Sequence, residues 1–562
     1  MAPVDFISDI ARIISGAAAG RFSEWGNPDL GNSIILDRPA ARQHGDLSTN
    51  IAMIAASVAG RPPRELATEL IDDLKADSRL SGIVQSIELA GPGFINFFLT
   101  GEALVGAARD ALALGADYGS GTLNETQNIL LEFVSANPTG PLHVGHARYA
   151  AYGDSLARIF SFSGLKVTKE FYINDYGSQM NLFGKSVASR YAQSFGIDAR
   201  LPEDGYQGDY PVHIAELIKS EIGDRFVAGL SPEPGDEAVG FFRNRGCELV
   251  LEEMRSNLDR FRVSFDVWFS ESGLYDEGAV MASIDELRQA GEVIEREEAL
   301  WLCTTRYGDD KDRVLVRGSG DPTYFASDIA YHRDKLGRGF NKLMNIWGAD
   351  HHGYVPRMKA AFEALSHDPE MLEIIIGQLV NVVELGEKKQ MSKRAGTMVS
   401  LEELLDSIGV DAARFFLVDR SHDSTLDLDL EKAKLKSEEN PVYYVQYAHA
   451  RICSILRKAE AEISGDSSVS EYDAVEDQER ELILKLLEFP LAVQTAADNR
   501  GPQRITAYAR ELAATFHTFY HNCPVIKAEP GTASFRIDLC GLTRNVIASC
   551  LNLVGVSAPE SM

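Results

Sequence analysis

Two histidines that could bind an anion stand three residues apart in the segment EFVSANPTGPLHVGHAR, which begins at Glu132. On a helix, His143 and His146 share one face. If the helix begins here, its unpaired backbone N–H groups and its dipole also attract negative charge. Gly145 between them carries no Cβ, so a flat base could lie against the backbone. The pattern indicates a nucleotide phosphate site, although two ordinary surface histidines at a helix start would give the same short pattern.

A second segment, ELGEKKQMSKRAGTMVS, is polar, contains glycine and carries Lys388, Lys389, Lys393 and Arg394. Lysines act as mobile point charges, which suit a triphosphate that loses its pyrophosphate. A solvated basic loop is the more usual role of such a run. The two segments together, in this order, are hard to obtain by chance and favour the nucleotide interpretation.

The elements that must position these residues are a strand, a helix and a strand. Residues 128–135 have the composition of a short buried strand, and Pro141 stands near the expected start of the following helix. That helix should end at Gly164, a natural C-cap, before a second strand at 166–175. A βαβ unit of this kind predicts a parallel sheet with a right-handed crossover.

The rest of the chain is expected to divide into three parts. Residues 1–115 form a mixed α/β module with a strand–turn–strand unit at 87–99, and 115–128 have the composition of a linker. In the sheet domain (116–430), segments 314–318 and 341–353 should add strands, and 190–300 is a helical, charged insertion. Residues 431–562 are all amphipathic helix. The predicted fold class is multidomain: a Rossmann-type parallel-sheet α/β domain with an insertion, an N-terminal α/β module and a C-terminal helical bundle.

Composition excludes several classes of protein. The 562 residues contain no apolar run of the roughly 20 residues that a membrane span needs and no basic signal segment at the start. Six scattered cysteines without a CxxC pair argue against a zinc site or a disulfide framework and suit the cytoplasm. A net charge of −28 opposes non-specific nucleic-acid binding. The charge is segregated, however, because 500–562 contain six Lys/Arg and four acids.

HVGH followed by MSK resembles the two signature motifs of class I aminoacyl-tRNA synthetases. Longer strings resemble the bacterial arginyl-tRNA synthetases, and they are EFVSANPTGPLHVGHAR, DPTYFASDIAYHRDK, WGADHHGYVPRMKAA, VQYAHAR and LNLVGVSAPESM. The similarity covers essentially the whole chain, from HGDLSTN and AGPGFINFF onward. It implies a catalytic domain that makes arginyl-adenylate from L-arginine and ATP and then esterifies tRNA(Arg).

The resemblance also implies roles at the ATP site. Its catalytic residues are His143, His146, Ser392 and Lys393, and its ATP-binding residues are His143, Gly145, His146, Gly348, Asp350, Met391 and Lys393. One position departs from the family pattern, because Gln390 replaces the usual first lysine of the loop. A lysine before the histidine motif compensates in some family members, but Gly140 stands there. Which cation assists Lys393 is left open.

A guanidinium pocket needs paired carboxylates, and the residue types agree with the resemblance. Glu132 lies between Leu131 and Phe133, where an unused charge would be costly. Tyr324 and Asp328 are four apart and share a helix face. The resemblance places the arginine-binding residues at Glu132, Ser135, Asn137, Tyr324, Asp328 and His352.

The segment 440–460 interleaves tyrosines with arginines, which suits base stacking and phosphate contacts, although tyrosines that pack a core would look the same. The resemblance makes this part the anticodon-binding domain and the N-terminal module the part that touches the tRNA elbow. The implied tRNA-binding residues are Tyr447, Arg451, Tyr520, Met562 and Asn96.

ATP with Mg²⁺ is the expected substrate complex, with no protein-bound metal, and the expected state is a cytoplasmic monomer. Three alternatives compete with this interpretation. A glutamate or cysteine synthetase would need basic pocket residues or a zinc thiolate site. A short nucleotidyltransferase would lack the helical domain. A non-catalytic RNA-binding paralogue conflicts with the intact motifs, Gln390 excepted.

Overall fold

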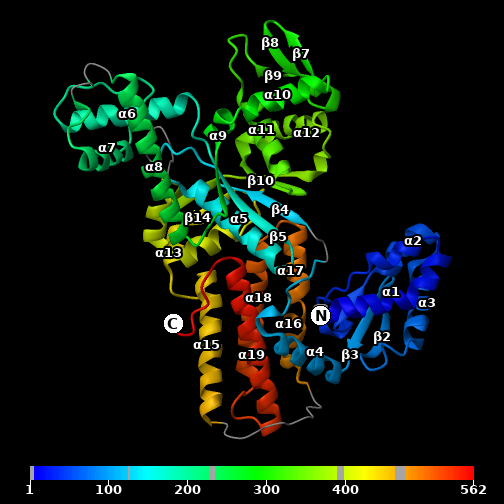
Figure 1. Cartoon of the computed structure of the whole chain (residues 1–562). Coiled ribbons are helices and arrows are strands. Elements are labelled where there is room, and N and C mark those ends of the chain that lie inside the picture. Colours follow the sequence, from blue (N-terminus) through cyan, green and yellow to red (C-terminus); the bar gives the residue numbers. More distant parts are fainter. Residues whose placement is uncertain (1–4, 124–126, 228–229, 231–233, 389–397, 463–474) are drawn as a thin grey trace.

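A computed structural model of the chain describes residues 5–123, 127–227, 230, 234–388, 398–462 and 475–562. Figure 1 shows an N-terminal module to one side, a central sheet region that carries two protruding subdomains, and a group of long helices at the opposite end. None of the helices in the described ranges is long and apolar enough to cross a membrane.

The N-terminal module is a small antiparallel sheet, in the order β1-β3-β2, packed against helices. Its strands are β1 (Leu47–Thr49), β2 (Val84–Ala90) and β3 (Phe94–Leu99), and its helices are α1 (Phe6–Glu24), α2 (Ile51–Ala59) and α3 (Pro63–Ala76). The predicted strand–turn–strand unit at 87–99 is confirmed. Helix α4 (Gly101–Leu114) then leads away toward the C-terminal helices.

The central sheet is parallel, with the strand order β11-β10-β4-β5-β6. Its elements are β4 (Asn128–Glu132), α5 (Val144–Phe162), β5 (Lys166–Ile173), β6 (Val267–Ser270), β10 (Lys342–Gly348) and β11 (Leu372–Gly377). The predicted βαβ unit is confirmed, since β4 and β5 are parallel neighbours joined by α5. Strand β10 pairs with the other side of β4. The carboxyl ends of β4 and β10 therefore mark a topological switch point, where ligands bind in open parallel sheets.

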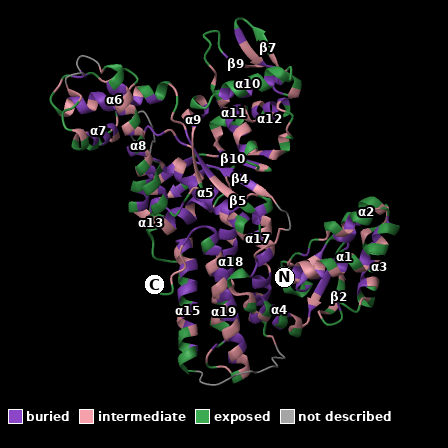
Figure 2. Ribbon diagram, viewed as in Figure 1, coloured by how far each residue is buried: buried purple, intermediate pink, exposed green. Residues whose placement is uncertain are grey.

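Helices cover both faces of this sheet. Alternating residues of β4 divide between the two cores: Leu131 packs in the core that contains α5, and Leu130 in the core that contains α11 (Tyr324–Gly337) and α12 (Val355–Ala364). Figure 2 shows that α5 is buried along most of its length. A helix enclosed on all sides has little freedom to shift, so the turn at its start is well positioned for a site.

Two expectations about the catalytic domain need correction. The strand predicted at 314–318 exists as β9 (Arg313–Val316), but it pairs antiparallel with β8 (Ala299–Leu302) in a separate sheet with β7 (Val293–Arg296). A short apolar run predicts a strand without naming its partner, and the nearby β7–β8 hairpin offers the local edge.

The range 190–300 is mostly helical, as predicted, but it is interrupted by β6, which returns to the central sheet. Its helices, including the one that enters it, are α6 (Ser178–Ser194), α7 (Tyr210–Ile222), α8 (Asp236–Arg260), α9 (Glu271–Asp276) and α10 (Ala279–Gln289). Helices α6, α7 and α8 form one of the two subdomains that protrude in Figure 1.

A second small sheet, in the order β13-β12-β14, leads into the C-terminal helices. Its elements are β12 (Val380–Glu384), β13 (Glu387–Lys388), α13 (Leu401–Val418) and β14 (Leu426–Asp429). The predicted all-helical region is confirmed by α14 (Leu430–Lys434), α15 (Pro441–Glu462), α16 (Asp477–Leu487), α17 (Phe489–Asp498), α18 (Gln503–Asn522) and α19 (Pro530–Leu553). The predicted fold class is therefore confirmed, while the boundaries at 115 and 430 stay predictions.

The connection predicted as a linker at 115–128 is partly anchored. It begins with a short 3-10 helix (Gly115–Asp117), after which Tyr118 is buried and its hydroxyl donates to the carbonyl of Leu486 in α16 at 3.1 Å. The start of this segment is therefore packed against the helical domain through Tyr118.

The packing of α5 on β4 predicts an effect of substitution at Gly153. A Cβ at this helical glycine would lie 2.4 Å from the ring of Phe133, which is fully buried. Gly153→Ala should therefore destabilise the protein by about 1–3 kcal/mol through overpacking. The measurement is the thermal unfolding midpoint. Gly106→Ala in α4 is the control, because nothing lies within 4 Å of its Cβ position. Equal midpoints for the two variants would refute the packing argument.

Candidate active site

The HVGH turn lies at the first residues of α5. His143 is the N-cap, and its Nδ1 accepts a hydrogen bond from the backbone N–H of Gly145 at 3.1 Å. His146 Nδ1 accepts from the backbone N–H of His143 at 3.3 Å, and the two rings stack with centroids 3.7 Å apart. With both Nδ1 atoms accepting, the proton of each neutral imidazole lies on Nε2, which can donate to a phosphate oxygen.

Gly145 is required by this geometry, because a Cβ there would lie 3.0 Å from His143 Cε1.

The second motif meets the first through its flank. Residues 389–397, which include Met391, Ser392 and Lys393, lie outside the described part of the chain. Directly after them, the backbone N–H of Val144 donates to the carbonyl of Val399 at 3.0 Å, and that of Leu401 to the carbonyl of Leu142 at 2.7 Å. The two motif segments, far apart in the sequence, are thus paired as neighbouring strands would be.

Directly before residue 389, Lys388 lies in β13 and forms an ion pair with Asp427 at 3.0 Å. Its ammonium is therefore held at the small sheet by a carboxylate.

The end of β4 carries the predicted carboxylate in a strained segment. Val134 and Ser135 have φ values of 71° and 41°, a region that non-glycine residues rarely adopt. The strained turn brings Ser135 Oγ back to donate to Glu132 Oε1 at 2.9 Å, while it accepts the backbone N–H of Tyr172 at 3.2 Å. Such strain is typical of functional sites.

Glu132 is only 5% exposed and has a partner that sequence reasoning missed. Its Oε2 accepts from Nζ of Lys335 at 2.6 Å, and this lysine is fully buried. Lys335 Nζ also donates to Asn345 Oδ1 at 3.0 Å. A buried carboxylate without a cation would be costly, so Lys335 is the group that allows Glu132 to lie inside the sheet domain.

The same network reaches the second predicted carboxylate. Asn345 Nδ2 donates to His332 Nε2 at 2.8 Å, and Nδ1 of His332 donates to the carbonyl of Asp328 at 2.7 Å. Burial, with Lys335 nearby, lowers the pKa of His332 to about 3, so the ring is neutral and can both donate and accept. This chain of bonds ties α11 to β4 and β10.

Asp328 and Tyr324 lie on the first turns of α11, as predicted. The hydroxyl of Tyr354 donates to Asp328 Oδ2. Burial, together with the charge of Glu132, raises the pKa of Asp328 to about 7. Tyr324 is 55% exposed, so it borders the site from outside.

Glu271 is a third carboxylate of the site that sequence reasoning missed. It follows β6 directly and is 2% exposed, and its Oε2 has no hydrogen-bond partner among the described residues. Burial, and then the charges of Asp328 and Asp175, raise the pKa of Glu271 to about 8. The signal in the sequence is weaker for it than for Glu132, because Glu271 follows the apolar run VWF but lies between Ser270 and Ser272. Carboxylates from two parallel strands and from α11 thus meet at one sheet edge.

A cavity of about 230 Å³ lies at Tyr324, one helical turn before Asp328. It is lined by Asn137, Asn174, Tyr176, Gln179 and Tyr324. Nδ2 of Asn137 donates to Gln179 Oε1 at 2.7 Å. Two predicted pocket residues, Asn137 and Tyr324, therefore line one space.

The residues predicted for the nucleoside follow β10. Gly348 ends this strand, and a Cβ there would lie 2.6 Å from Asp350 Oδ1, so a larger residue would displace the Asp350 side chain. Asp350 and His352 lie exposed in the 3-10 helix Ala349–Tyr354. The hydroxyl of Tyr149 on α5 donates to the carbonyl of Gly377 at 3.2 Å. The ends of β10 and β11 thus lie against the helix that carries the HVGH turn.

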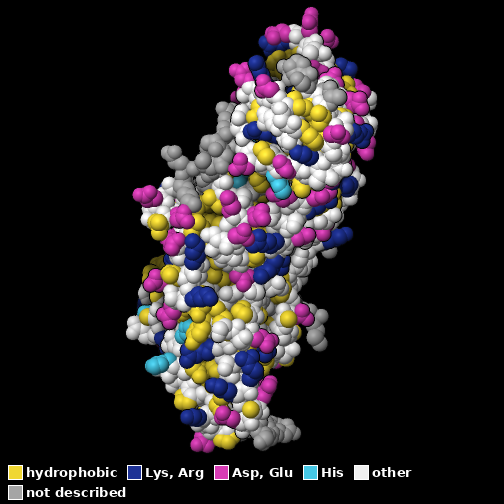
Figure 3. Space-filling model, turned by 90° about the vertical axis from the view of Figure 1, so that its left-hand side faces the viewer, with side chains coloured by type: hydrophobic (Ala, Val, Ile, Leu, Met, Phe, Trp, Pro, Cys, Tyr) yellow, Lys and Arg dark blue, Asp and Glu magenta, His cyan; other side chains and the backbone are white. Residues whose placement is uncertain are grey.

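A third group of predicted residues lies on the C-terminal helices. Arg451 on α15 is 4.8 Å from the ring of Tyr520 on α18 and 5.9 Å from that of Tyr447, both measured from Cζ to the ring centroid. Tyr447 is 40% exposed, and Met562 is 56% exposed. Figure 3 views the molecule from the side on which α15 lies and shows Lys and Arg side chains gathered over its lower half. Tyr447, Arg451 and Tyr520 therefore form one aromatic and cationic surface.

Asn96, the tRNA-binding residue implied for the N-terminal module, lies inside β3. It is 4% exposed, and its Oδ1 accepts from Ser48 Oγ at 2.7 Å. A contact between this side chain and RNA stays a prediction.

In the parts of the chain that the structure describes, no group of three or more His, Cys, Asp or Glu side chains could hold a metal ion.

Comparisons with known proteins agree on one family. Three family models match in succession: "Arginyl tRNA synthetase N terminal domain" over 7–99, "tRNA synthetases class I (R), catalytic domain" over 109–452 and "DALR anticodon binding domain" over 445–562. The arginine–tRNA ligases of Geobacillus kaustophilus and Bacillus subtilis are 47% and 44% identical over 532 and 535 residues, and each comparison covers 94% of both chains.

The solved arginyl-tRNA synthetase of Thermus thermophilus is similar with a TM-score of 0.77 at 24% identity. The comparison covers 99% of this chain and 100% of that one. This likeness supports the fold.

The Lys335–Glu132 pair predicts a specific pattern of stability. Lys335→Met should lower the free energy of unfolding by about 3–5 kcal/mol, because it leaves a buried carboxylate unpaired. Adding Glu132→Gln should restore most of this loss, since the uncompensated charge is gone. Chemical denaturation of the single and double variants measures the effect. A double variant no more stable than Lys335→Met would contradict the pairing.

Proposed function

The chain belongs to the arginyl-tRNA synthetase family, and on this premise we propose which of its residues carry each step of the family's reaction. The chain ligates L-arginine to tRNA in an ATP-dependent reaction. In the general mechanism of the class, the arginine carboxylate attacks the α-phosphorus and pyrophosphate leaves. A ribose hydroxyl at the tRNA end then attacks the acyl carbon of arginyl-adenylate, and AMP leaves.

The ATP phosphates are proposed to lie at the start of α5. His143 and His146 would donate from Nε2 to phosphate oxygens as charge develops on the pentavalent phosphorus, and Gly145 would leave room for the nucleoside. Support comes from the stacked imidazoles at a helix N-terminus. Gly348 and Asp350 are proposed to contact the nucleoside at the end of β10, beside α5.

Ser392 and Lys393, with Met391, are proposed to hold the leaving pyrophosphate. They belong to a segment outside the described residues, and its following flank is bonded to the HVGH turn through Val144 and Leu401. This pairing supports a placement of the loop next to the phosphates.

Gly140, where some family members carry a compensating lysine, faces the ring of Tyr210: a Cβ at Gly140 would lie 3.1 Å from Cζ of that tyrosine. A longer side chain would have to displace this ring. The positive charge is therefore proposed to come from the loop itself, with Lys393 as its main carrier.

Mg²⁺ is proposed to arrive with ATP. The imidazoles of the HVGH turn are poor ligands for this hard cation, which prefers oxygen. The ion is therefore proposed to enter as part of the substrate complex.

The observation that carries the choice of substrate is the group of carboxylates at the sheet edge. Asp328 and Glu271 are proposed to bind the guanidinium, with Glu132 held in place by Lys335 as part of the same wall. Planar carboxylates match the donor fork of a guanidinium, which cannot lose its proton. An amino acid with a carboxylate in its side chain would be repelled. The remaining predicted residues are proposed to surround the rest of the amino acid: Ser135, Asn137, Tyr324 and His352.

The helical domain is proposed to bind the tRNA anticodon through the surface of Tyr447, Arg451 and Tyr520, with Met562 nearby. Exposed aromatic rings offer faces to unpaired bases, and Arg451 adds charge for phosphate. Their contact with one another supports a single RNA surface in a chain of net charge −28. The monomeric state and the cytoplasmic location stay proposals.

The activity is tested by ATP–pyrophosphate exchange with each of the twenty amino acids, with and without tRNA. We expect exchange with arginine and with no other amino acid, because the carboxylates of the pocket match the guanidinium side chain. Lys393→Ala should slow adenylate formation far more than it weakens tRNA binding. Exchange with a different amino acid, or none from folded protein that still binds tRNA, would refute the proposal.

Arginine binding should depend on pH. Asp328 faces the acid Glu132 and the cations Lys335 and Arg357, whereas Glu271 faces the acids Asp328 and Asp175. Burial outweighs the two cations, and the pKa values of about 7 and 8 mean that both acids are partly protonated at neutral pH. A bound guanidinium favours the carboxylates, so binding lowers both pKa values and releases protons. The affinity should therefore rise by roughly tenfold or more from pH 6 to 8.5 and level off above the higher pKa.

Calorimetric titration of arginine in buffers of different ionisation enthalpy measures both the affinity and the protons released. Glu271→Gln is the matched variant: it should remove the step near pH 8 and keep the one near pH 7. An affinity independent of pH over this range would contradict the role of both acids.

A further inference from the structure

Residues 554–562, which follow α19, form an extended segment that we call the strap. Figure 1 shows the strap (red) leaving α19 and ending beside α15. Gln446 Nε2 on α15 donates to the carbonyl of Ser557 at 2.9 Å, and His449 Nδ1 lies 2.9 Å from the carbonyl of Pro559. The strap is therefore bonded along its length to the helix that carries the RNA surface.

One carboxylate, Asp411, bonds the strap to α13. Its Oδ1 accepts the backbone N–H of Ser557 at 3.0 Å and Nη1 of Arg262 at 2.5 Å. Its Oδ2 accepts Nε2 of Gln446 at 2.9 Å and the hydroxyl of Ser557. Although burial opposes it, these bonds lower the pKa of Asp411. Helix α13, helix α15 and the strap thus meet at one ionised group.

Arg414, one turn further along α13, is fully buried and makes a second connection. Its Nε donates to the carbonyl of Val554 at 2.8 Å, and its Nη2 to Asp154 Oδ2 at 2.8 Å. A Cβ at Gly555 would lie 2.2 Å from Arg414, and φ there is +68°, so only glycine lets the strap pass this close.

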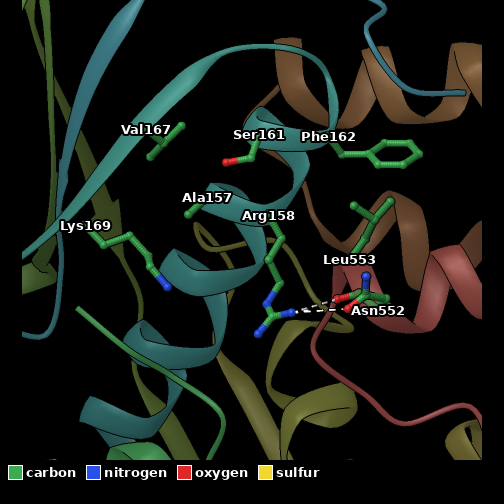
Figure 4. A pocket seen from close by; sticks show the side chains of 8 residues that line it. All are labelled: Ala157, Arg158, Ser161, Phe162, Val167, Lys169, Asn552 and Leu553. Atoms are coloured by element: carbon green, nitrogen blue, oxygen red, sulfur yellow. Dashed lines mark hydrogen bonds between the residues drawn. The ribbon is translucent and has the colours of Figure 1, made fainter. Parts of the chain in front are cut away.

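Asp154 lies on α5, the helix that begins with the HVGH turn. It also holds Arg158 Nε at 2.6 Å and Lys169 Nζ at 3.0 Å. Figure 4 shows Arg158 pointing to the end of α19, where its Nη1 donates to Asn552 Oδ1 at 3.3 Å, while Lys169 comes from the strand on the other side of α5. The second half of α13 is therefore bonded to the strap on one side and to α5 on the other.

The first half of α13 reaches the ATP site. Leu401 at its start is bonded to Leu142, and Val399 just before it to Val144. The two halves meet at Gly409, whose φ of 77° and ψ of 165° break the helix. The second half, which Asp411 and Arg414 hold, therefore fixes the point at which the first half ends.

We propose that Asp411 is a positioning residue for adenylate formation. By bonding the strap to α13 it holds the second half of this helix, and through it the segment 399–401 beside the HVGH turn. The inference rests on the proposed role of the HVGH turn.

The test compares Asp411→Asn with Asp406→Asn. Both residues lie on α13 and pair with an arginine at the end of α8: Asp411 with Arg262, and Asp406 with Arg260, each at 2.5 Å. Asp406 is largely exposed and does not touch the strap. Single-turnover adenylate formation is measured at saturating arginine, ATP and tRNA, and the Michaelis constant for tRNA in steady-state aminoacylation.

Asp411→Asn should lower the single-turnover rate constant by roughly tenfold to a hundredfold, because small misplacements of reacting groups have effects of this size. Its Michaelis constant for tRNA should change less than about twofold. Asp406→Asn should leave both values unchanged. Ser557→Ala should reproduce the slow step from the strap side, and the double variant should be no slower than Asp411→Asn.

Other outcomes overturn the inference. A merely structural role would lower the amplitude of the single turnover, which counts active molecules, and leave its rate constant unchanged. A raised Michaelis constant with a normal rate constant would make the strap part of the RNA surface only. Failure of the proposed function is distinguishable, because the unaltered protein would then show no arginine-dependent turnover in the same assay.

Discussion

The structure of the site depends on one buried ion pair, between Glu132 at the end of β4 and Lys335 of α11. A carboxylate cannot lie unpaired inside a sheet domain, and a lysine cannot be fully buried without an acceptor. Each group makes the other's burial possible, and Asn345 satisfies a further donor of the ammonium. Because the two residues come from opposite layers, the pair also fixes α11 over the sheet and places Asp328 near Glu132.

The acids of the pocket therefore differ in how well their negative charge is compensated. Glu132 is compensated by a resident cation, whereas Asp328 and Glu271 have raised pKa values because burial and neighbouring acids disfavour their charge. A permanent cation relieves that penalty on entry, and a neutral amino acid does not. The family's choice of arginine thus agrees with the electrostatics of the unliganded pocket.

Charged groups also connect the parts of the molecule. The N-terminal module meets the helical domain through ion pairs, among them Arg480 with Asp46 at 2.7 Å, and the Asp154 cluster joins α5, β5 and α13. Both joints use Arg or Lys to hold carboxylates and carbonyls at element ends. Several arginines and lysines of this acidic chain are thus committed to internal contacts, while Arg451 and the two tyrosines beside it remain on an outer face.

The sequence by itself determined the βαβ unit and the helical C-terminal region, because these follow from local periodicity and capping, and it singled out Glu132 by its apolar neighbours. Asp328 and the role of the HVGH turn were assigned through the resemblance to a family, and their roles stay proposals. It did not determine which sheet β9 joins, because a short apolar run does not name its partner strand. Glu271 was missed because its neighbours Ser270 and Ser272 are polar, and Lys335 was missed because its burial depends on packing. A lysine near the end of a helix usually faces solvent, and only the packing of α11 on the sheet buries it against β4. The tertiary structure likewise decided that the strap meets α13, since hydrogen bonds between residues more than a hundred positions apart leave no periodic trace in the chain.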